Sequence, residues 1–167
     1  SAVGGGFGGK LDCSVQPLLA VAAWILEKPI RCTFTRPESL ASSTKRHPAK
    51  MKASASCDTD GSLTSLSFEG DFNTGAYASW GPTVADRVPI HCSGPYFVPN
   101  ILAKTRALLT NGPPSGAFRG FGVPQSAIAH EALMDSLAEQ TGIDPLEFRL
   151  KNALRKGQKT GSGQLLE

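Results

Sequence analysis

The sequence lacks the features that mark membrane, nucleic-acid-binding and metal-thiolate proteins. Its longest apolar stretch, residues 17–26, falls well short of the roughly 18 residues that a membrane-spanning helix needs. The net charge of +3 is too small to indicate a nucleic-acid surface. No C-x-x-C pair occurs among the four cysteines, so the common iron–sulfur and zinc motifs are absent. We expect a cytoplasmic protein with reduced cysteines that binds neither membrane nor nucleic acid.

The remaining composition is that of a folded globule with many turns. Hydrophobic residues make up 40% of the 167 residues and charged residues 19%, while glycine and proline number 18 and 12. The chain has no initiator Met, and residues 156–164 are rich in Gly, Ser, Thr, Lys and Gln. We therefore expect residues 1–167 to be a fragment of a larger subunit, with 156–167 as a surface loop or tail.

Periodicity and capping residues predict both helices and strands. Helices are expected over 14–26, 83–91 and 124–141 and after residue 144, and strands over 30–35, 50–57, 63–72 and 101–110. Ser14 is the expected N-cap of the first helix, whose apolar character predicts burial on most sides. Asp58-Thr59-Asp60-Gly61 predicts a hairpin turn, and Asp144-Pro145 a capped helix start. The fold class is α+β, a mixed sheet with packed helices.

The glycine run at Gly4–Gly9 is similar to two nucleotide-binding motifs, the dinucleotide-binding loop and the phosphate loop. In each case the sequence lacks a residue that the motif requires. Its G-x-G-x-x-G spacing is not followed, about twenty residues on, by the acidic residue that would bind a ribose. Its similarity to the NTPase phosphate loop fails at Leu11, where Ser or Thr would bind Mg²⁺. A structural glycine turn stays open, and so do backbone N–H groups that approach an anion or polar cofactor.

A second glycine-rich loop surrounds Arg119 with two aromatic residues. Gly116, Gly120 and Gly122 flank Phe118, Arg119 and Phe121. An arginine between two rings offers forked donors beside a flat apolar wall. A surface arginine beside two core phenylalanines is the alternative.

Together the two loops resemble the molybdenum hydroxylases, the xanthine dehydrogenase and aldehyde oxidase family. Gly-Gly-Gly-Phe-Gly-Gly-Lys at 4–10 precedes Gly-Ala-Phe-Arg-Gly-Phe-Gly-x-Pro-Gln at 116–125. Further agreement lies in Arg46-His47-Pro48, in Val98-Pro99-Asn100 and in the segment 144–152. The resemblance covers nearly the whole chain and implies part of the molybdopterin-binding domain of a large subunit.

The resemblance also implies a cofactor and the residues that bind it. The cofactor would be a molybdenum pyranopterin, either molybdopterin or its cytosine dinucleotide. The residues matching the family's cofactor contacts are Gly6, Phe7, Gly8, Gly9, Ala117, Phe118 and Arg119. Of these, Phe7 and Arg119 would lie nearest the molybdenum.

A substrate site and a reaction follow from the same resemblance. Phe121 would pack on a planar substrate ring, Arg87 would lie at the substrate pocket, and Leu11 stands where purine-oxidising relatives have a glutamate. The reaction would hydroxylate an aldehyde or aromatic N-heterocycle with oxygen from water. Electrons would leave through iron–sulfur clusters, and these clusters and FAD are expected on other domains or subunits.

The sequence contains no candidate for the catalytic base. In the family, the general base is a glutamate in a Gly-x-Gly-Glu segment, and this segment does not occur here. The carboxylates of Glu131, Asp135 and Glu139 are expected to form a solvated helix face. We therefore assign no catalytic residue and expect the isolated chain to be an inactive part of an oxidoreductase. The alternatives are a stand-alone anion- or nucleotide-binding module that uses the glycine loops, and a pure interaction domain.

Overall fold

The computed structural model describes residues 3–167, which form two compact units. One unit, here the loop unit, comprises residues up to 48 together with 73–81 and 108–119. The other, here the sheet unit, comprises 49–72, 82–107 and 120–167. No helix in the described residues is both long enough and apolar enough to cross a membrane.

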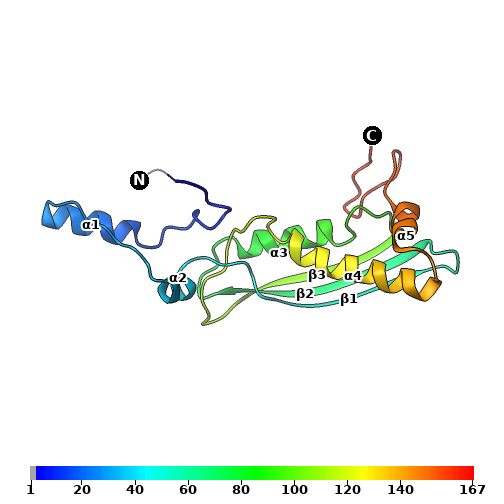
Figure 1. Ribbon diagram of the computed structural model, residues 1–167, viewed down its shortest axis with the longest axis horizontal. Coiled ribbons are helices and arrows are strands. Elements are labelled where there is room, and N and C mark those ends of the chain that lie inside the picture. The colour runs from blue at the N-terminus through cyan, green and yellow to red at the C-terminus, as the bar shows by residue number, and fades with distance from the viewer. Residues whose placement is uncertain (1–2) are drawn as a thin grey trace. The chain divides into compact units, whose positions relative to one another are not determined.

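The loop unit contains two helices, α1 (Gln16–Leu26) and α2 (Arg36–Ser42) (Figure 1). A capping box starts α2: the Glu38 N–H donates to Thr35 Oγ1 at 3.4 Å, and the Thr35 N–H donates to Glu38 Oε2 at 2.7 Å. The strand expected over 30–35 is wrong, because this segment is irregular and runs directly into α2. The Thr-x-x-Glu signal that predicts α2 was available in the sequence.

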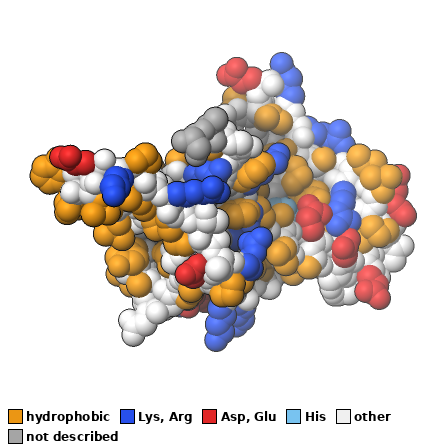
Figure 2. All heavy atoms as spheres, turned by 60° about the vertical axis from the view of Figure 1, so that its left-hand side comes forward, with side chains coloured by type: hydrophobic (Ala, Val, Ile, Leu, Met, Phe, Trp, Pro, Cys, Tyr) orange, Lys and Arg blue, Asp and Glu red, His pale blue; other side chains and the backbone are white. Residues whose placement is uncertain are grey.

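Helix α1 differs from its expectation in two respects. Val15 is its N-cap and no side chain caps it, so Ser14 does not have the predicted role. All eleven residues of α1 are described and none is buried, whereas burial on most sides was expected. Trp24 is 81% exposed and Leu18 71%. In Figure 2, where the side of the molecule that carries α1 in Figure 1 is turned forward, hydrophobic side chains are exposed at the left.

The sheet unit begins with the predicted hairpin. Strands β1 (Ala49–Cys57) and β2 (Leu63–Gly75) pair antiparallel, with Ala49 opposite Phe72 and Ser54 opposite Ser67. In the turn, the Asp58 N–H donates to the Ser62 carbonyl at 2.9 Å. The backbone of Gly61 has a φ of +83°, which favours glycine.

The third strand makes the sheet mixed. Strand β3 (Asn100–Leu109) lies beside β2 in the order β1-β2-β3. Asn100 Nδ2 donates to the Thr64 carbonyl at 3.0 Å, and farther along both strands Arg106 Nε donates to Asp71 Oδ1 at 2.6 Å. Contacts that advance together along two strands indicate a parallel pair. Helix α3 (Gly81–His91) supplies the crossover, which confirms the α+β class.

Helices α3 and α4 (Val123–Thr141) cover one face of this sheet (Figure 1). Along β2 the buried side chains alternate, so one face of the strand enters the core. The core residues are Leu63, Leu66, Phe68, Phe72, Ala85, Val88, Cys92, Tyr96, Val98, Met134, Ala138 and Phe148. This apolar cluster fixes the helices on the sheet.

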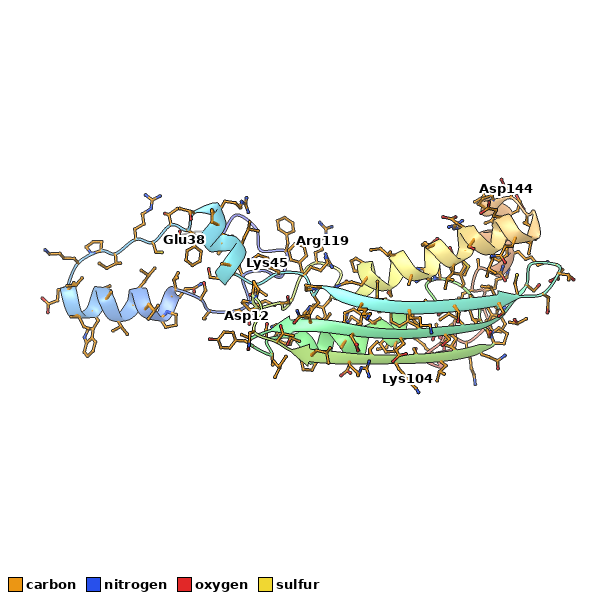
Figure 3. All side chains as sticks on the ribbon, turned by 90° about the horizontal axis from the view of Figure 1, so that it is seen from below. Asp12, Glu38, Lys45, Lys104, Arg119 and Asp144 are labelled. Atoms are coloured by element: carbon orange, nitrogen blue, oxygen red, sulfur yellow. The ribbon has the colours of Figure 1, made fainter. Side chains whose placement is uncertain are left out.

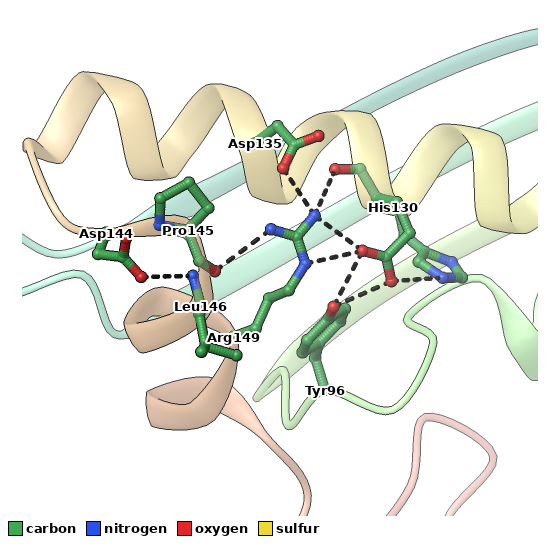
Figure 4. A network of polar contacts seen from close by, with 8 residues as sticks. Tyr96, His130, Asp135, Asp144, Pro145, Leu146 and Arg149 are labelled. Atoms are coloured by element: carbon green, nitrogen blue, oxygen red, sulfur yellow. Dashed lines mark hydrogen bonds and ion pairs between the residues drawn. The ribbon is translucent and has the colours of Figure 1, made fainter.

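An ion-pair network joins α4 to α5 (Pro145–Asn152) (Figure 4). Arg149 donates to Glu131 Oε2 at 2.9 Å and to Asp135 Oδ1 at 2.7 Å. The Tyr96 hydroxyl donates to Glu131 Oε1 at 2.9 Å, and burial together with this carboxylate raises the pKa of Tyr96 to about 12. Asp135 and Glu139 are exposed and Glu131 is partly exposed, which agrees with the expected solvated face, but the guanidinium of α5 also pairs with Glu131 and Asp135.

The side chain of Asn152 ties the end of α5 to the hairpin. Its Oδ1 accepts from the Leu63 N–H at 2.8 Å, and its Nδ2 donates to the carbonyls of Gly61 and Phe148, both at 2.9 Å. Asn152 is 6% exposed, so water cannot replace these partners. One buried amide thus satisfies backbone groups from both the hairpin and the helix.

We predict that Asn152→Ala lowers the free energy of unfolding by about 2–4 kcal/mol, because the Leu63 N–H and the Gly61 carbonyl stay buried without a partner. Urea denaturation measures the change. The matched control is Lys151→Ala, which removes only a solvent-exposed ion pair with Asp60 and should cost about 0–1 kcal/mol. Equal losses for the two variants would contradict the assignment.

Candidate functional site

The first glycine loop is a tight turn with its aromatic residue on the outside. The Gly9 N–H donates to the Gly6 carbonyl at 2.8 Å. Phe7 and Gly8 both have left-handed backbone, with φ of +49° and +89°. A positive φ is strained for phenylalanine. The Phe7 side chain is 66% exposed, so the turn presents this ring rather than packing it.

The second glycine loop docks directly on this turn through backbone atoms. The Arg119 N–H donates to the Phe7 carbonyl at 2.8 Å. A Cβ added to Gly8 would lie 2.9 Å from both the carbonyl carbon and the oxygen of Ala117. Only glycine permits this approach, which brings Gly8 against the backbone of Ala117. Direct docking of the two loops was not predicted from the sequence, which indicated only that both would contact the cofactor.

Asp12 provides a second anchor for the first loop. Its Oδ2 accepts from the Ser79 hydroxyl at 2.8 Å and from the Thr44 hydroxyl at 3.1 Å. A Cβ on Gly116 would lie 3.0 Å from the same oxygen, so the second loop also passes close to Asp12. Asp12 was not predicted from the sequence, because its partners come from distant positions and no local spacing signals them.

Residues 44–46 run beside the second loop in parallel register. The Lys45 N–H donates to the Pro114 carbonyl at 3.1 Å, and the Gly116 N–H donates to the Lys45 carbonyl at 3.0 Å. The Lys45 ammonium turns away to the Ser39 carbonyl at 2.6 Å, and burial lowers its pKa. Asp12, Lys45 and Arg119 are labelled in Figure 3, which shows this part of the loop unit.

Arg46 contacts two neighbouring residues of the second loop. Its Nη2 donates to the Arg119 carbonyl at 2.6 Å. Its guanidinium carbon lies 4.6 Å from the centroid of the Phe118 ring, which is a cation–π contact. In the sequence, Arg46 stands out only as part of the matching Arg-His-Pro segment, which by itself indicates no role for it.

The two residues predicted for substrate lie together in the sheet unit. The guanidinium carbon of Arg87, on α3, is 5.5 Å from the centroid of the Phe121 ring. Phe121 has a φ of +50°, between two glycines that also have positive φ. A Cβ on Gly122 would lie 2.8 Å from the Val84 carbonyl oxygen, so this loop is seated tightly on α3.

Leu11, the third residue predicted for substrate, lies in the loop unit and is 60% exposed. In the described part of the chain it takes part in neither loop docking nor the Arg87–Phe121 contact. An open cavity of about 530 Å³ also lies in the loop unit, and Asp12, Cys13, Thr44 and Tyr77 are among its lining residues. None of the residues predicted to bind cofactor lines this cavity.

The docked loops fit a cofactor that brings its own metal ligands. Within residues 3–167, no three His, Cys, Asp or Glu side chains converge as a metal site. The loops instead present close-packed backbone, the exposed rings of Phe7 and Phe118, and the exposed Arg119. Such a surface suits a flat, polar, anionic group, since arginine pairs with oxyanions and rings pack on planar ligands.

We predict that Gly8→Ala separates the loops, because its Cβ meets the Ala117 backbone and its φ of +89° disfavours alanine. Tryptic cleavage after Arg119 should then rise about ten-fold or more, since local opening governs proteolysis. Mass spectrometry of a limited digest measures the rate. Gly4→Ala is the control, because a Cβ there has nothing within 4 Å. An unchanged rate in Gly8→Ala would contradict the docking.

Comparison with known proteins supports the chemistry that the loops suggest. A family model described as the molybdopterin cofactor-binding domain matches residues 1–153. The nicotinate dehydrogenase large molybdopterin subunit of Eubacterium barkeri is 47% identical over 98% of this chain and 39% of its own length. The xanthine dehydrogenase molybdenum-binding subunit of Escherichia coli O157:H7 is 35% identical over 93% of this chain and 21% of its own length.

A solved structure agrees with these relatives. Aldehyde oxidoreductase from Desulfovibrio gigas matches with a TM-score of 0.91 and 36% identity, over 98% of this chain and 18% of that one. The chain thus spans well under half the length of the proteins that it matches. These comparisons give no support to a stand-alone anion- or nucleotide-binding module. The docked glycine loops, the family model and the relatives agree, and the chain belongs to the molybdopterin cofactor-binding domain of the molybdenum hydroxylase family.

Proposed function

We propose that this chain holds the molybdopterin cofactor of an oxidoreductase that hydroxylates an aldehyde or an aromatic N-heterocycle with oxygen from water. The observation that carries the proposal is the backbone docking of the two glycine loops, with the Arg119 N–H on the Phe7 carbonyl. The names of two relatives, a nicotinate dehydrogenase and an aldehyde oxidoreductase, support the two substrate classes.

The chain's part in this function is to bind and orient. Gly6–Gly9 and Ala117–Arg119 would hold the cofactor, with Phe7 and Arg119 nearest the metal. When bound, the cofactor supplies the redox chemistry, accepting the electrons that leave the substrate. Preorganised backbone and guanidinium donors would hold charge on the cofactor without reorganising, which is how protein dipoles assist such reactions. We assign no catalytic base to this chain.

Substrate selection would rest on Arg87 and Phe121. The ring offers a wall for a flat substrate, and the exposed guanidinium can pair with a carbonyl or carboxylate. As partners we propose the rest of the large subunit and domains or subunits that carry iron–sulfur clusters and FAD. The four cysteines are unpaired, and Cys13 and Cys32 are exposed, which suits a reducing compartment such as the cytoplasm.

We predict that the full-length enzyme contains molybdenum and, in H₂¹⁸O, gives a hydroxylated product that carries ¹⁸O. Residues 1–167 expressed alone should retain no molybdenum and show no turnover, because a pocket with only part of its walls loses most of its affinity. Metal analysis and product mass spectrometry provide the measurements. A label that comes from ¹⁸O₂, or a full-length enzyme without molybdenum, would refute the function. Near-stoichiometric molybdenum in the isolated chain would refute its dependence on the other parts.

We predict that the full-length enzyme prefers an aldehyde or simple N-heterocycle over xanthine by about 100-fold or more in kcat/KM, because Leu11 leaves polar purine groups unpaired. Leu11→Glu should narrow this preference, whereas Leu11→Met, an apolar control of similar volume, should not. Steady-state kinetics on both substrate classes decide the matter. A kcat/KM for xanthine equal to that for every other substrate tested would refute the role of Leu11.

A further inference from the structure

Arg46 joins two consecutive loop residues that would hold the cofactor. It lies 73 positions before Arg119, whose carbonyl accepts from its Nη2 at 2.6 Å. Its guanidinium also lies over the Phe118 ring, with the carbon 4.6 Å from the centroid. One planar group therefore fixes a backbone carbonyl and an aromatic plane in consecutive residues.

The backbone around Arg46 explains why it reaches this position. The bridge between Lys45 and Ser115 places residues 44–46 in parallel register with 114–116. Two hydrogen bonds close this bridge, from Lys45 N–H to Pro114 O and from Gly116 N–H to Lys45 O. Arg46 directly follows the bridged Lys45, and Phe118 lies a few residues after the bridged Ser115, so the two segments run in the same direction and Arg46 is close to Phe118.

The arrangement leaves one donor of the guanidinium without a partner. Nη1 of Arg46 is buried and has no hydrogen-bond acceptor among residues 3–167. A buried unsatisfied donor typically costs about 1–3 kcal/mol, and more when it is charged. An apolar side chain of similar volume could pack on Phe118 without this loss. An arginine here therefore carries a cost in stability, and what it adds over an apolar residue is a planar fork that serves both contacts.

We propose that Arg46 is a positioning residue of the cofactor site. By holding the Arg119 carbonyl and the Phe118 ring together, it keeps Ala117–Arg119 in the single conformation that docks on Phe7 and Gly8. Lysine cannot replace it, because an ammonium is a point charge with no plane to stack on the ring and no fork to orient. The proposal rests on the proposed cofactor-binding function and adds the residue that shapes the loop.

The test compares full-length Arg46→Lys and Arg46→Met enzymes with wild type and with Arg36→Lys. Arg36 is an exposed arginine in the same unit and outside the docked loops, so it controls for loss of a guanidinium. Readouts are molybdenum per polypeptide, the Mo(V) electron paramagnetic resonance spectrum, thermal unfolding, and kcat and KM.

In both Arg46 variants we expect an altered Mo(V) spectrum and a kcat lower by about ten- to a hundred-fold, with a smaller change in KM, because small misplacements near reacting groups have effects of this size. Unfolding should stay within a few degrees of wild type, and Arg36→Lys should match wild type throughout.

Three outcomes would overturn the positioning role. The first is a wild-type spectrum and kcat in Arg46→Lys. The second is the same defect in Arg36→Lys. The third is global unfolding of both Arg46 variants, which would show that Arg46 supports the fold as a whole. Failure of the proposed function is distinct, since the wild-type enzyme itself would then lack molybdenum.

Discussion

The proposed cofactor site depends on one backbone contact, in which the Arg119 N–H donates to the Phe7 carbonyl while Gly8 lies against Ala117. The two segments are more than a hundred residues apart in the sequence, and they meet through backbone atoms. The hydrogen bonds of Asp12 anchor the first glycine loop, and the bridge between Lys45 and Ser115 anchors the second. This contact explains why the site needs glycine at position 8 and tolerates a left-handed phenylalanine at position 7.

In the proposed function, binding the cofactor and selecting the substrate would use different groups. Backbone groups, which every sequence has, would bind the cofactor, whereas substrate selection would need side chains that differ. In this chain the selective candidates are Arg87, Phe121 and Leu11. Arg87 and Phe121 are placed by α3 and by the glycines around Phe121, and the tight seat of Gly122 on Val84 fixes that loop.

The packed core of the sheet unit supports the segments that carry Arg87 and Phe121. Its strands and helices share one apolar core, and buried Asn152 together with the Arg149 network joins α5 to the hairpin and to α4. Helix α1 of the loop unit shows the opposite character, because its apolar side chains are exposed. An exposed apolar helix of this kind is typical of a surface that contacts another part of a protein.

The sequence alone determined the hairpin, helices α4 and α5 and the α+β class, because turn residues, caps and periodicity act over a few positions. It also determined the family, through the motifs at 4–10 and 116–125. It also identified both glycine loops, since their composition is local. It did not place Asp12 or Arg46, whose partners lie tens of residues away, and it predicted a strand at 30–35, where the described structure is irregular. Tertiary structure decided these points, because hydrogen bonds and close contacts between distant segments depend on how the chain returns on itself.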